Sequence, residues 1–124
     1  MTKIRFDLFR LFSTPVFVGK LGLETKEILK VKTNIEKEKY ILNANQSAER
    51  SEDVHILDKK KFKFIKDKIN SAFDIYKNDV FKYQNTNMIM TSSWVAKHAA
   101  ACFGDYHNHT NSMFSGVYYV NTTK

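Results

Sequence analysis

The amino-acid sequence predicts an α+β fold in which two helices precede a run of strands. Apolar residues recur at the helical period in residues 24–40 and again in residues 59–82. Residues 88–124 are instead rich in β-branched, aromatic and hydroxyl-bearing side chains, with short turns between them. A chain of 124 residues has the length of one domain with one core. We therefore expect a single domain over 1–124, with an N-terminal strand and the helices in 1–87.

The composition is that of a folded protein, with 43% hydrophobic and 14% aromatic residues. No run approaches the roughly 18 apolar residues that a membrane-spanning helix needs. Asp7 and Arg10 stand where a signal peptide would have its apolar segment, and the single Cys102 excludes an internal disulfide bond. We therefore expect a cytoplasmic protein without a membrane partner.

Residues 4–22 predict a strand, a turn and a second strand. Ile4, Phe6 and Leu8 alternate with charged residues, and a nearly continuous apolar run then surrounds Pro15. Two glycines close the segment. We expect this unit to lie in a sheet or along the edge of one.

The two helices are predicted from the spacing of their apolar side chains. In residues 24–40, Lys and Glu fill the positions between the apolar ones, as in an amphipathic helix. Asp58 is placed to cap the second helix, and the polar segment Asn43–Asp53 between the two helices predicts a loop. The strongest helical period in the chain is formed by Phe62, Ile65, Ile69, Ala72, Phe73, Tyr76 and Val80.

The C-terminal third predicts three strands. The first covers residues 88–98 and passes through Trp94, the second is short and covers His107 to His109, and the last covers residues 113–120. Turn-forming residues lie between them. This succession of strands after the helices completes the α+β prediction.

The net charge of +7 raises the question of nucleic acid. Lysine supplies most of this charge, and Lys59 to Lys61 form the one tight cluster, which continues along the helix over 59–82. The whole sequence has only three arginines, whereas nucleic-acid modules usually interleave arginine and aromatic residues on one face. The pattern favours a solvated helix face, and a nucleic-acid-binding helix is the weakest of the functional hypotheses.

His107 and His109 form a possible metal site. In an extended segment these side chains point to the same side, roughly 6.5 Å apart, which allows both to bind one ion. Imidazole suits Fe, Zn, Ni or Cu better than Mg or Ca. An open catalytic centre needs a third protein ligand. His98 could supply it, whereas Asp105 would lie about 13 Å from position 109 on an extended strand and cannot join both histidines.

The two histidines begin a longer pattern, His107-x-His109-x-Asn111-Ser112, which leads into Ser-Gly-Val-Tyr-Tyr-Val at residues 115–120. Trp94 lies upstream, and Phe-Ser-Thr-Pro-Val occupies residues 12–16. This pattern resembles the 2-oxoglutarate and Fe(II) dependent oxygenases of phage and marine bacteria. The resemblance is specific over residues 88–121 and loose over residues 4–87.

The resemblance implies N-terminal helices packed on a double-stranded β-helix, the jelly-roll barrel of cupins, whose first strands would be residues 88–124. It implies Fe(II) and 2-oxoglutarate as cofactor and cosubstrate, with His107 and His109 as the first two iron ligands. Asn111 and Tyr119 would contact the cosubstrate. The wider superfamily has a carboxylate as second ligand, so His109 is a departure from the usual facial triad.

In complete relatives the distal His and the basic partner of 2-oxoglutarate follow the Gly-Val-Tyr-Tyr-Val strand. Only four residues follow Val120, so the resemblance implies a C-terminally truncated dioxygenase, or hydroxylase, with an incomplete barrel. Its substrate, a small molecule or a protein, stays open. The alternative is a non-catalytic half-barrel that serves as a binding or structural module. In either case the open sheet edge could pair with a second copy or with a complementing C-terminal chain.

Overall fold

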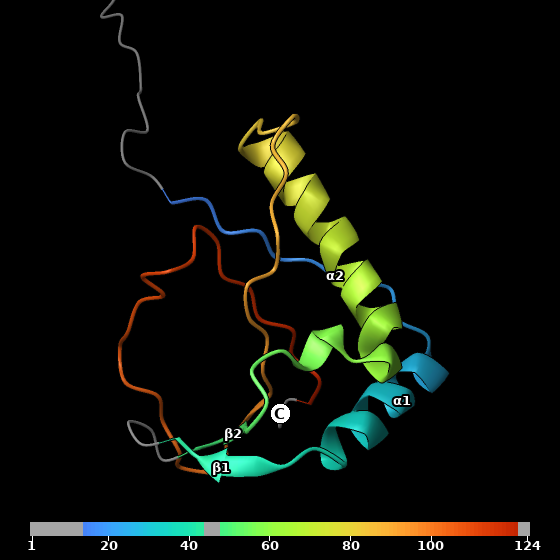
Figure 1. Cartoon of the computed structure of the whole chain (residues 1–124), viewed down its shortest axis with the longest axis vertical. Helices are drawn as coiled ribbons and strands as arrows, with labels where there is room; N and C mark the ends of the chain where they lie inside the picture. Colours follow the sequence, from blue (N-terminus) through green and yellow to red (C-terminus); the bar gives the residue numbers. More distant parts are fainter. Residues whose placement is uncertain (1–13, 44–47, 122–124) are drawn as a thin grey trace, which may run out of the picture.

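A computed structural model describes residues 14–43 and 48–121 of the chain (Figure 1). The described elements, in chain order, are helix α1 (Thr25–Glu36), strands β1 (Tyr40–Leu42) and β2 (Glu49–Ser51), the 3-10 turns η1 (Ile56–Asp58) and η2 (Lys60–Phe62), helix α2 (Lys63–Ile75), the π-helical turn η3 (Tyr76–Val80) and strand β3 (Ala96–Lys97). Helices and antiparallel strands thus occur in one chain, and the predicted α+β class is confirmed.

Helix α1 confirms the predicted first helix but is shorter than residues 24–40. It begins where the carboxylate of Glu27 accepts a hydrogen bond from the backbone N–H of Glu24, at 2.8 Å. Its face toward the core carries the buried Val31. The chain leaves the helix after Glu36 and enters β1 four residues later.

The predicted second helix over 59–82 is confirmed as η2, α2 and η3 in succession. The prediction that Asp58 caps it is wrong, since no side chain makes a capping hydrogen bond at the start of α2. The Asp58 carboxylate instead lies 2.5 Å from the Nζ of Lys66 in α2. The ammonium group of Lys66 therefore binds the carboxylate oxygen that a capping hydrogen bond would use.

The strands form one small antiparallel sheet in the order β1-β2-β3. Tyr40 is paired with Ser51, and Arg50 with Ala96. A parallel bridge between His55 and Ser93 extends the contact between the two halves of the chain. Strand β3 lies at the edge of the sheet.

Several predicted strand and loop boundaries are wrong. The predicted loop Asn43–Asp53 contains β2, and the strand predicted over 88–98 is reduced to Ala96–Lys97. Two further predicted strands, over residues 107–109 and 113–120, are not formed. Of the strands predicted in 4–22, residues 14–22 form none, and residues 4–13 lie outside the described part of the chain. Alternation predicts extended backbone, whereas strand pairing depends on a neighbour that single segments do not specify.

The core lies where α1, η1 and α2 meet. Its buried side chains are Val31, Ile56, Phe62 and Ile65. Tyr118 and Val120 pack against this cluster from the C-terminal segment, so the last described residues return to the core. Phe114 contacts Phe73 and Tyr76 of α2 and η3 at ring-centroid distances of 5.4 and 5.8 Å.

Between β3 and Phe114, residues 99–112 form a wide arc on the side away from α2 (Figure 1, orange). The arc carries both histidines of the predicted metal site. No helix of the described residues is long and apolar enough to span a membrane.

Candidate metal-binding site

The structure brings His107 and His109 together. Their ring centroids lie 5.1 Å apart, and the ring planes are inclined by 77°. Both residues are exposed on the arc. The predicted strand is absent here, yet the side chains at i and i+2 still lie beside each other.

The ring of His107 is oriented by the backbone carbonyl of Asp105. Its Nδ1 lies 2.7 Å from the carbonyl oxygen of Asp105. A carbonyl oxygen can only accept, so Nδ1 carries the proton, and in the neutral ring Nε2 then holds the free lone pair. Metal-binding histidines commonly donate their second ring N–H to a carbonyl in this way, which fixes the tautomer and the ring orientation.

The ring of His109 packs beside Trp94. The two centroids lie 5.8 Å apart with the planes inclined by 42°. The Trp94 side chain is 41% exposed, so this contact lies at the surface and not in the core. His109 therefore has two ring neighbours, the indole of Trp94 and the second imidazole.

A third ligand is not found among residues 14–43 and 48–121, in which no group of three His, Cys, Asp or Glu side chains could hold a metal ion. His98, the candidate from the neighbouring predicted strand, is exposed at the end of β3. The donor set on the arc thus fits two positions of an imidazole-binding metal such as Fe(II). The remaining positions would be filled by a chelating ligand, water or a group from elsewhere.

The two predicted cosubstrate contacts, Asn111 and Tyr119, are both exposed, Asn111 on the arc and Tyr119 after it. Tyr118 faces the other way and packs on the core, and this burial raises the pKa of its phenol. The alternation expected of an extended segment therefore holds for this pair. Of these two tyrosines, Tyr119 is the one whose side chain is exposed at the surface.

Sequence reasoning missed the two contacts that orient the histidine rings. The Asp105 contact is made by a backbone carbonyl, for which no residue type is a signal. Trp94 precedes His109 by fifteen residues, and only the return of the arc to the sheet region brings the rings together. The sequence shows a Trp before the two histidines, but it does not show how close the indole lies to their rings in the folded chain.

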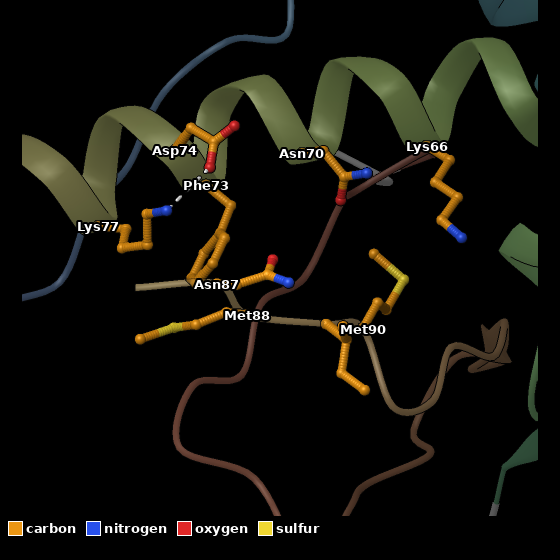
Figure 2. A pocket seen from close by; sticks show the side chains of 9 residues that line it. Lys66, Asn70, Phe73, Asp74, Lys77, Asn87, Met88 and Met90 are labelled. Carbon is orange, nitrogen blue, oxygen red and sulfur yellow. Dashed lines mark ion pairs between the residues drawn. The ribbon is translucent and has the colours of Figure 1, made fainter. Parts of the chain in front are cut away.

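A cleft of about 400 Å³ lies between α2 and the segment that precedes β3 (Figure 2). Its charged groups already have partners: Lys77 lies 3.5 Å from the Asp74 carboxylate and donates to the carbonyl of Thr86 at 3.0 Å. Lys66, at the other end, pairs with Asp58. The lining residues are Lys66, Asn70, Phe73, Asp74, Lys77, Asn87, Met88, Ile89 and Met90. Engaged lysines leave little free charge to attract a ligand here.

The lysine cluster is also neutralised locally. The Glu38 carboxylate is nearly buried and pairs with both Lys59 and Lys61. Burial opposes its ionisation, but the hydrogen bonds from the two lysines outweigh this and lower the pKa of Glu38. These pairs favour a structural role for the lysines over nucleic-acid binding.

Comparison of the chain with family models, with curated proteins and with solved structures finds no match in any of the three. Functional inference therefore rests on the sequence pattern around His107 and on the ring geometry of the arc.

Proposed function

We propose that this chain carries part of an Fe(II) and 2-oxoglutarate dependent dioxygenase centre, with His107 and His109 as two of the iron ligands. The observation that carries the proposal is the 5.1 Å separation of the rings, with His107 Nδ1 engaged by a carbonyl so that Nε2 is left for a metal. The sequence pattern from His107 to Val120 selects Fe(II) among the metals that imidazole suits.

The proposal includes a jelly-roll framework. It is supported by the antiparallel sheet and by the return of the C-terminal segment to the core, where Tyr118 and Val120 pack. The described part of one chain holds no group of three possible ligands. The third metal ligand and the cationic partner of the cosubstrate would therefore come from a second copy of the chain or from a complementing polypeptide.

When bound, Fe(II) with 2-oxoglutarate and dioxygen supplies hydroxylation of an unactivated C–H bond, with succinate and CO2 as the coproducts. The chain's own residues bind and orient. His107 and His109 would hold the ion through ring nitrogens, and the Asp105 carbonyl keeps the proton of His107 on Nδ1. The Asn111 amide and the Tyr119 hydroxyl, both exposed, would donate hydrogen bonds to the cosubstrate carboxylates.

The test is an anaerobic Fe(II) titration followed by 2-oxoglutarate, with detection of the visible charge-transfer band of the chelate. We expect the band in the wild type and its loss in His107→Ala and in His109→Ala. His55→Ala is the matched control, because His55 is also an exposed histidine but lies outside the arc, where its backbone forms the bridge to Ser93. Iron affinity that is equal in all four proteins would show that the pair is not a ligand set.

A second candidate is the non-catalytic module that associates with a second copy of the chain. It is favoured by large apolar side chains left on the surface of the C-terminal segment, among them Tyr106, Met113 and Val117. Sedimentation equilibrium with EDTA present separates the two candidates. Dimerisation that persists without metal, together with no charge-transfer band, would favour the module.

A further inference from the structure

We infer that Trp94 is a positioning residue for His109, and that its indole holds the imidazole in the orientation in which the histidine pair binds a divalent metal. The metal part of this inference rests on the proposed function. The ring contact itself, 5.8 Å between centroids, is observed independently of that proposal.

Trp94 is held from its N-terminal side by Ser93. The Ser93 N–H donates to the carbonyl of Val54 at 2.7 Å, and the Ser93 carbonyl accepts from Ile56 N–H at 3.0 Å. The Ser93 hydroxyl oxygen accepts a third bond, from Leu57 N–H, at 3.0 Å. Three hydrogen bonds thus tie the residue before Trp94 to Val54 and to the turn η1, which carries the buried Ile56.

Trp94 is held equally from its C-terminal side by Val95. The Val95 N–H donates to the hydroxyl oxygen of Ser51 at 3.0 Å, and its carbonyl accepts from Ser51 N–H at 2.8 Å. Ser51 is fully buried at the end of β2. The backbone of Trp94 is therefore fixed on both sides, which fixes the point from which its indole extends toward the ring of His109.

His109 is held by a local backbone contact. Two such hydrogen bonds lie in the arc, from Cys102 N–H to Ala99 and from Ser112 N–H to His109, at 3.1 and 3.0 Å. The second of these restrains the His109 backbone but leaves its ring free to rotate. The indole restricts that rotation, so less side-chain entropy remains to be lost when a metal binds.

The two rings of the pair are thus oriented by different means, His107 by the Asp105 carbonyl and His109 by Trp94. Groups that orient a metal ligand typically change metal affinity tenfold or more when removed. A ring contact without a hydrogen bond belongs at the low end, so we expect Trp94→Ala to weaken metal binding roughly fivefold to tenfold.

The experiment uses the full chain and Co(II), whose visible spectrum reports imidazole coordination. Affinity is measured for the wild type, Trp94→Ala and Trp94→Phe, with Tyr83→Ala as a control that removes an aromatic side chain distant in sequence from the pair. Far-UV circular dichroism checks the fold of each. We expect weaker binding in Trp94→Ala, recovery in Trp94→Phe and no change in Tyr83→Ala.

A second readout needs no metal. The indole should displace the NMR signal of the His109 ring proton at Cε1, and Trp94→Ala should move this signal while that of His55 stays in place. An unchanged His109 signal would overturn the inference, and so would Co(II) affinity equal to wild type in Trp94→Ala. In the second case the proposed function would stand, because the histidine pair would still bind. Failure of the wild type to bind Co(II) or Fe(II) would overturn both.

Discussion

The carboxylate of Glu38 lies 2.5 Å from the Nζ of Lys59 and also pairs with Lys61, which joins the chain after α1 to the start of the second helical segment. The Asn34 side chain reinforces this joint by donating to the carbonyl of Lys61 at 2.9 Å. The Glu38 side chain is 6% exposed, so water solvates its carboxylate poorly and the two ammonium groups stabilise its charge instead.

Glu38→Gln should therefore lower the free energy of unfolding. The lost pairs would cost several kcal/mol if fully buried, but the lysine side chains are 37% and 35% exposed and water can take over part of their solvation. We expect a loss of about 1–2 kcal/mol, measured by urea denaturation. Glu36→Gln, an exposed carboxylate at the end of α1, is the control and should change stability by less than about 0.5 kcal/mol.

The same pair predicts how stability depends on pH. The pKa of Glu38 in the folded chain lies below its ordinary value of 4.5. The unfolded chain therefore binds the proton more readily, so the stabilisation is complete above pH 4.5 and is lost as the pH falls through the folded-state value. Asp53 acts in the same direction, because the backbone N–H of His55 and then Lys59 lower its pKa.

Urea denaturation of wild type and Glu38→Gln at several pH values between 3 and 7 measures this dependence. The difference between the two proteins should be constant at neutral pH and should shrink below pH 4.5. A difference that grows on acidification would contradict the assignment.

Ile65→Val tests the core. Ile65 is 2% exposed on the face of α2 that meets Phe62 and Val31, so the lost methylene leaves a small cavity that costs about 0.5–1.5 kcal/mol. Ile75→Val is the same substitution in the same helix at a residue that is 52% exposed, and it should cost less than about 0.5 kcal/mol. Equal losses in thermal unfolding would mean that the two faces of α2 are not distinguished as described.

Ser51→Ala tests the attachment of the segment that carries Trp94. The Ser51 hydroxyl accepts from Val95 N–H and donates to the carbonyl of Asp53 at 2.8 Å. Its removal leaves a buried N–H without that acceptor, which should cost about 1–3 kcal/mol. The emission of Trp94, the only tryptophan in the sequence, should also shift. Ser92→Ala, at an exposed serine, should leave both stability and emission unchanged.

The helices were predictable because their information is local. The recurrence of Phe62, Ile65 and Ile69 at steps of three and four requires a helix for these side chains to share a face, whatever they pack against. The absence of a cap at Asp58 was not predictable, because Lys66 comes close enough to pair with the Asp58 carboxylate only after the helix has formed. Strand β2 escaped prediction for a similar reason, since the polar segment Glu49–Ser51 becomes a strand through its partners on both sides.

For the candidate site, the sequence alone determined the chemistry: the His-x-His spacing, the metals that imidazole suits, and the side-by-side placement that any extended backbone gives to residues 107 and 109. Only the folded structure decided how each ring is oriented. The Asp105 carbonyl contacts His107 through the local course of the backbone, and the Trp94 indole contacts His109 through the tertiary course of the arc. Residue type sets what a side chain can bind. Its orientation depends on neighbours that only the folded chain brings within contact distance.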